Sequence, residues 1–120
     1  TARIPKQEAM RANYNSDYCV ALTDPSSTGI YAKIYDYIAS GTPILLIPTD
    51  QLMMEEIVRT LGAGKTIVNK EELKAFLLEQ VNNKRKGIAP AKTALDKGKA
   101  WQYSREAQAQ KAVENILSIL

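Results

Sequence analysis

The chain has 120 residues, is 45% hydrophobic and carries a formal net charge of +3, which suits one domain with its own core. It contains no histidine, and this excludes the commonest general base, the Ser-His and Cys-His nucleophile pairs and most zinc sites. We expect no metal and no cofactor, and the composition identifies no catalytic residue.

The single cysteine, Cys19, lies in the apolar run 18–22, which predicts a buried strand. One cysteine cannot form an internal disulfide, so we expect a packed thiol in a reducing compartment. The apolar run 43–48 is too short to span a bilayer, and no signal peptide opens the chain. These features predict a cytoplasmic protein.

The positive charge is concentrated in one segment. Residues 84–111 carry a balance of +6, and the rest of the chain carries −3. Such a segment can contact nucleic acid or anionic lipid, or it can be a solvated connection. No nucleic-acid recognition motif is present, and the only interleaved aromatic residues are Trp101 and Tyr103. We expect no nucleic-acid partner, and contact with an anionic membrane surface stays an alternative.

The chain alternates helical and strand patterns. The predicted helices cover residues 6–15, 29 or 30 to 40, 51–61, 71–84 and 104–120, and the predicted strands cover 17–23, 43–47 and 65–68. Gly41 and Gly62 are predicted to end helices. Residues 85–99 form an irregular basic segment. This order predicts an α/β fold with a parallel sheet and right-handed crossovers.

Three strands are few for such a sheet, and the chain starts at Thr1 without a methionine. We interpret residues 1–120 as a single domain cut from a longer protein, the second half of a doubly wound domain. An open sheet edge invites pairing, so a homodimer of this fragment is one expectation.

The run 62–66, Gly-Ala-Gly-Lys-Thr, resembles the end of a phosphate-binding P-loop. The P-loop requires an earlier glycine where Arg59 stands, and it follows a strand and opens a helix. Here a predicted helix precedes the run and a strand follows it. We interpret Gly62 as a helix cap and Gly64 as a turn.

The loop that ends at Gly29 is the better candidate for binding phosphate. It leads from the carboxyl end of a predicted strand into a helix N-terminus, where ligands of α/β sheets bind and where free N–H groups favour anions. At about 100° per residue, Gly29, Lys33, Asp36 and Ser40 share one line along this helix. That line predicts a face toward a ligand, although Lys33 and Asp36 can also pair on a solvated strip.

Residues 31–45, YAKIYDYIASGTPIL, resemble the signature K-[IL]-[FY]-E-Y-[ML]-A-x-G-x-P-[IV] of bacterial group 1 glycosyltransferases, family 4-like retaining enzymes of the GT-B type. Weaker similarities at residues 3–8, 14–17, 61–64 and 103–111 extend the resemblance over nearly the whole chain. It implies a three-layer, Rossmann-like parallel sheet flanked by helices, which is the C-terminal part of a nucleotide-sugar-binding domain.

The resemblance also implies roles for particular residues. Asp36 stands where a glutamate of the family binds the ribose hydroxyls, and the backbone of Ile4 lies against the base. Backbone groups near Gly29 and Ile30 contact the phosphates or the sugar. Lys33 lies between these groups and can neutralise phosphate charge or hold Asp36.

Two positions depart from the family pattern. Thr28 replaces the first carboxylate of the Glu-x7-Glu pair, which contacts the donor sugar, and Asp36 is one methylene shorter than glutamate. The residues that clamp the diphosphate and the whole acceptor domain have no counterpart in this chain. We therefore expect the isolated chain to lack transfer activity.

The sequence thus predicts the donor-binding part of a glycosyltransferase that moves a sugar from a nucleotide diphosphate to a glycan or lipid-linked acceptor. The full-length enzyme would be cytoplasmic or held at the inner face of the membrane, in polysaccharide biosynthesis. Two alternatives stay open. One is a non-enzymatic flavodoxin-like binding or regulatory domain, and the other is a sugar-nucleotide epimerase of the same architecture.

Overall fold

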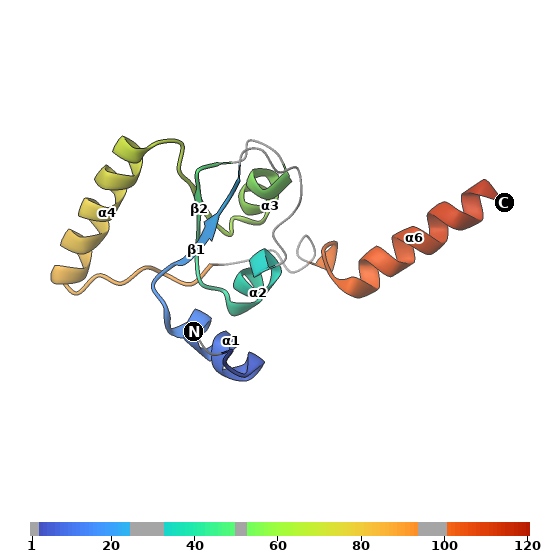
Figure 1. The fold of residues 1–120 in the computed structure, drawn as a ribbon, viewed down its shortest axis with the longest axis horizontal. Helices are drawn as coiled ribbons and strands as arrows, with labels where there is room; N and C mark the ends of the chain where they lie inside the picture. Colours follow the sequence, from blue (N-terminus) through green and yellow to red (C-terminus); the bar gives the residue numbers. More distant parts are fainter. Residues whose placement is uncertain (1–2, 25–32, 50–52, 94–100) are drawn as a thin grey trace.

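The computed structural model describes residues 3–24, 33–49, 53–93 and 101–120 (Figure 1). It contains eight regular elements in these ranges, and helices and strands alternate from α1 to α4. They are α1 (Lys6–Asn15), β1 (Cys19–Leu22), α2 (Lys33–Ser40), β2 (Ile44–Ile47), α3 (Met53–Leu61), β3 (Gly64–Thr66), α4 (Lys70–Arg85) and α6 (Arg105–Ile119).

The three strands form one parallel sheet in the order β1-β2-β3. Cys19 lies opposite Ile44 in the first pair of strands, and Leu46 lies opposite Thr66 in the second. The first three residues of β2 are buried because this strand has a neighbour on each side. The sheet and its flanking helices confirm the predicted α/β class.

The hydrophobic core lies between the sheet and the helices α2 and α3. α2 contributes Ile34 and Ile38 because these residues, four apart, lie on one side of the helix. α3 is amphipathic in the same way and buries four side chains, while its acidic residues stay in the first turn. The core cluster consists of Ala21, Ile34, Ile38, Ile44, Leu46, Met54, Ile57, Val58, Leu61 and Ala63.

α4 lies on the other side of the strands from α3 (Figure 1). It has no buried residue. The Tyr18 ring meets Phe76 of α4 edge-on at 5.4 Å between centroids, and the Tyr18 hydroxyl donates to Gln80 Oε1 at 2.9 Å. Lys65 of β3 also contacts α4, with its Nζ 5.3 Å from the centroid of the Phe76 ring and 3.9 Å from Glu72 Oε1. At the end of the helix, Lys84 Nζ lies 2.5 Å from Asp17 Oδ2.

The strands are shorter than the sequence predicts. β1 does not extend to Asp17 and Thr23, and β3 covers Gly64–Thr66 and stops before Val68. Gly41 and Gly62 have φ of 72° and 60°, the left-handed conformation expected of helix caps. These two predictions are confirmed.

Gly64 is not a turn residue, which corrects our prediction. It is the first residue of β3 and pairs with Ile44 of β2. A Cβ atom built on Gly64 would lie 2.0 Å from the carbonyl oxygen of Ile44. Glycine therefore stands here because only a residue without a side chain allows the two backbones to approach this closely.

The chain returns from α4 to the amino-terminal ends of the strands. Residues 86–93 have no regular structure, as predicted for this part of the basic segment, whereas 94–100 lie outside the described residues. α6 begins after Ser104, whose Oγ accepts a hydrogen bond from the Ala107 N–H at 3.1 Å. None of the helices within the described ranges is long and apolar enough to cross a membrane.

Candidate functional site

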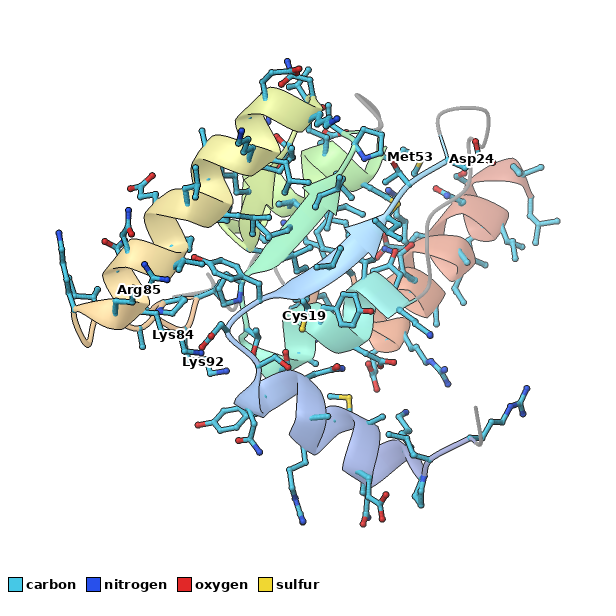
Figure 2. The ribbon with its side chains drawn as sticks, turned by 60° about the vertical axis from the view of Figure 1, so that its left-hand side comes forward. Cys19, Asp24, Met53, Lys84, Arg85 and Lys92 are labelled. Carbon is cyan, nitrogen blue, oxygen red and sulfur yellow. The ribbon has the colours of Figure 1, made fainter. Side chains whose placement is uncertain are left out.

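The predicted phosphate-binding loop follows the carboxyl end of β1. Three of its predicted site residues, Thr28, Gly29 and Ile30, lie outside the described residues. Asp24 is the last described residue before this loop, and Figure 2 shows it at the opposite end of β1 from Cys19. The candidate site therefore borders the carboxyl edge of a parallel sheet, the edge at which such sheets bind ligands.

α2 carries the two charged residues of the candidate site in its first turn. Lys33 is exposed at the start of the helix, and Asp36, three residues later, is half-buried. No ion pair joins these two described side chains. The interpretation in which they only pair with each other therefore has no support, and Asp36 is positioned at the edge of the helix that borders solvent.

Ser40 does not belong to the polar line expected along this helix. It is 8% exposed, its hydroxyl donates to the Tyr37 carbonyl at 2.7 Å and accepts from the Thr42 N–H at 3.2 Å. Ser40 thus lies on the core side of α2, and its two hydrogen bonds stabilise the last turn of the helix. Tyr35, on the same helix, is 37% exposed. Of the residues on the expected polar line, the described ones that reach solvent, Lys33 and Asp36, both lie in the first turn of α2.

Ile4 lies just before α1, and its side chain is 56% exposed. α1 packs against α2, and Figure 1 shows α1 beyond the amino-terminal end of β1. The structure therefore does not bring Ile4 to the carboxyl edge of the sheet, where Asp24 lies. A role for the Ile4 backbone beside a base stays a prediction from the resemblance.

Two threonines hold the ends of the strands together at the carboxyl edge. The Thr23 hydroxyl donates to the Pro48 carbonyl, and the Thr49 hydroxyl donates to Glu55 Oε2. Their backbone N–H groups donate to Ile47 O and Ile67 O at 3.0 and 2.8 Å. These hydroxyls connect neighbouring elements, so the edge next to the candidate site is ordered by hydrogen bonds.

An apolar hollow of about 240 Å³ adjoins the same edge, between the ends of β2 and β3 and the start of α4. A hollow of this size accommodates one ring system and is smaller than the sites that enclose a drug-sized ligand. It is lined by Ile47, Pro48, Ile67, Val68, Asn69, Lys70 and Leu73. No sequence signal indicated this hollow, because its walls come from two stretches, 47–48 and 67–73, that are distant along the chain.

The amino-terminal edge is organised around Thr42, which is 1% exposed. Its hydroxyl donates to the Asn13 carbonyl at 2.7 Å and accepts from Lys92 Nζ at 2.6 Å. Lys92 also donates to the Tyr14 carbonyl and lies 4.4 Å from the centroid of the Tyr14 ring. The sequence left open whether the basic segment that contains Lys92 is a solvated connection or contacts an anionic partner. In the structure Lys92 joins three parts of the chain.

Cys19 is 5% exposed and free, as predicted. Burial raises the pKa of its thiol, while a hydrogen bond with Ser40 and the charge of Lys92 act in the opposite direction. The net result is a thiol that stays protonated at neutral pH, and the thiolate is the nucleophilic form. Cys19 is therefore a packing residue rather than a reactive one.

No group of three or more potential metal ligands occurs among the described residues. Comparison with protein-family models, with curated proteins and with solved structures found no match to this chain. The geometry of α2 and of the carboxyl edge, together with the sequence resemblance, is what bears on the function of this chain.

Proposed function

We propose that this chain is the donor-binding part of a glycosyltransferase, the half of a GT-B C-terminal domain that holds a nucleotide-diphosphate sugar. The observation that carries the proposal is the position of Lys33 and Asp36. Both lie in the first turn of α2, directly after the loop that leaves the carboxyl end of β1. A cation and a carboxylate beside a helix N-terminus suit a ligand that combines a diphosphate with a ribose diol.

In this proposal the two side chains have different tasks. The Asp36 carboxylate accepts hydrogen bonds from the two ribose hydroxyls, and the Lys33 ammonium group offsets the charge of the phosphates. Transfer of the sugar depends on positioning and on stabilising the leaving diphosphate. The acceptor, a glycan or a lipid-linked sugar, would bind to a domain outside this chain.

The remaining expectations belong to the same proposal. The domain would be the three-layer, Rossmann-like half of a cytoplasmic enzyme of polysaccharide biosynthesis. The 120 residues alone would not transfer sugar, because transfer in this class of enzyme also needs groups that bind the acceptor and clamp the diphosphate. Donor binding is thus the activity to measure.

The test is a titration of UDP, GDP, UDP-glucose and GDP-mannose into the ¹⁵N-labelled chain, followed by amide chemical shifts. We expect the shifts to concentrate in α2 near Lys33 and Asp36 for one base, with little change in α4 or α6. Asp36→Asn should weaken that ligand by about tenfold or more, because hydrogen bonds to charged groups contribute about 1.5–3 kcal/mol.

Glu79→Gln is the matched control, because it removes one exposed carboxylate from α4 without touching α2. Equal weakening by both substitutions would show that only net charge matters. No shift with any of the four ligands would count against donor binding by this chain and favour a non-enzymatic flavodoxin-like domain.

A further inference from the structure

α6 presents an apolar surface that no described part of its own domain covers. Residues three and four apart gather on one side of a helix, and here they define a stripe that runs the length of α6. The α6 stripe consists of Ala109, Ala112, Val113, Ile116, Leu117 and Leu120. Its large members are between 54% and 95% exposed.

The helix is attached to the body by its opposite side. Ala107 is the only buried residue of α6, at 9% exposed, and Tyr103, just before the helix, packs against the core cluster. At about 100° per residue, Ala107 lies roughly 160° around the helix from the middle of the stripe. The α6 stripe therefore faces away from the core, and Figure 1 shows the helix projecting from the rest of the molecule.

A helix of this length is marginally stable in water unless its apolar face is packed. Ile116 and Leu117 are 58% and 64% exposed. The described part of the chain therefore does not pack against the apolar face of α6. Apolar surface from elsewhere would stabilise the helix by packing against this face.

We infer that the α6 stripe pairs with the same stripe of a second copy of this chain, in antiparallel orientation. The two halves of the stripe differ in size: Ala109 and Ala112 lie in the first half, and Val113, Ile116 and Leu117 lie in the second. Antiparallel pairing about a twofold axis between positions 112 and 113 sets each large half against the small half of the partner, as close helix packing requires.

In this register Ile116 lies over Ala109 of the second copy, and Val113 lies over Ala112 of the second copy. Leu120 then meets position 105, where the aliphatic part of the arginine side chain can cover it. Parallel pairing would instead place large residues on large and leave the alanines facing each other. Self-complementarity of this kind favours a second copy over an unrelated helix.

The charges of α6 favour a protein partner over a membrane. Helices that lie in membrane interfaces carry many lysines and arginines on their polar face. α6 has two basic residues, Arg105 and Lys111, and two acidic ones, Glu106 and Glu114, so it is neutral. The rest of its polar side carries uncharged glutamine, asparagine and serine side chains.

The predicted dimer is weak. A 15-residue helix is about 22 Å long at ~1.5 Å per residue, so one helix pair buries less than the roughly 800 Å² per partner of a standard interface. We expect a dissociation constant in the micromolar range. This inference does not depend on the proposed donor site.

The test is sedimentation equilibrium of the whole chain between 5 and 500 µM. The wild-type chain should pass from monomer to dimer, and Ile116→Glu should weaken the association at least tenfold. Ser118→Glu adds the same charge to the polar side of the same helix and should change it by less than twofold. Amide spectra of β1, β2 and α3 check that each variant keeps its fold.

Disulfide trapping tests the orientation. With an added oxidant, an equimolar mixture of Ala109→Cys and Ile116→Cys chains should cross-link to each other faster than either variant cross-links to itself. Faster self-linking of Ile116→Cys would overturn the antiparallel arrangement.

Three other results would overturn the inference as a whole. The first is a monomer at every concentration. The second is a dimer that Ile116→Glu leaves intact, which would place the interface elsewhere, for example on the outer edge of β1. The third is a monomer that floats with phosphatidylglycerol vesicles through α6, which would make a lipid surface the partner.

Discussion

The two faces of the sheet are covered in very different ways. On one face, α2 and α3 bury apolar side chains against β1 and β2 in a continuous core. On the other face, α4 buries no residue and contacts the body through one aromatic pair and a few polar contacts. Stability should therefore reside in the first face, whereas α4 should open locally at lower free energy.

The largest expected effect is on the strand pairing that both faces share. Gly64→Ala places a Cβ 2.0 Å from the Ile44 carbonyl oxygen, which neither backbone can avoid without breaking the β2–β3 ladder. We expect a loss of at least about 4 kcal/mol in the free energy of unfolding, or failure to fold, as for overpacked sites at the severe end. Urea unfolding followed by circular dichroism measures it.

Gly62→Ala is the matched control for this prediction. Gly62 has a positive φ of 60°, but a Cβ there meets nothing within 4 Å. The free energy of unfolding of Gly62→Ala should fall only by about 1–2 kcal/mol, which is the cost of a left-handed backbone for a residue with a side chain. Equal losses for the two variants would contradict the close approach at Gly64.

The second prediction separates the two faces directly. Leu46 is fully buried in the core cluster, so Leu46→Ala should lower the free energy of unfolding by about 2–5 kcal/mol through lost burial and a cavity. Leu78 on α4 is 56% exposed, and Leu78→Ala should cost less than about 1 kcal/mol because little apolar surface is lost. Losses of similar size would show that α4 packs as tightly as α3.

The last prediction, with the smallest change in stability, tests whether α4 unfolds independently of α3. The Asn69 side chain accepts the Glu72 N–H at 2.9 Å and caps this helix. Asn69→Ala should cost about 1 kcal/mol, the usual value for a lost N-cap. Hydrogen exchange should accelerate in the first turns of α4 and stay unchanged in α3. Acceleration in α3 would mean that the two faces unfold as one unit.

Several features could be predicted from sequence because their signals are local. Gly41 and Gly62 follow apolar helical patterns, and both have the positive φ of a helix cap. The run 44–47 is continuously apolar, and it forms the central strand. Cys19 lies in an apolar run and is buried. In each case the neighbours within one turn or one strand decide the conformation.

Other features required the tertiary structure. Gly64 has the sequence context of a turn, and only its pairing with Ile44 shows why glycine stands there. Ser40 shares a helical line with Lys33 and Asp36, yet the contact of α2 with the core places it in the interior, with its hydroxyl accepting the Thr42 N–H. A periodic pattern gives relative directions around a helix, but packing sets which direction faces the core.

The residue pattern alone was enough to predict the α/β alternation, the helix caps and the buried central strand, and it drew attention to Lys33 and Asp36. The edge of the sheet that each residue borders became known only from the packing of the elements. This packing brought Lys92 to Thr42, 50 positions away along the chain, and left the α6 stripe uncovered. The physical reason is that local conformation depends on adjacent residues, whereas a contact between distant segments depends on how all the elements pack at once.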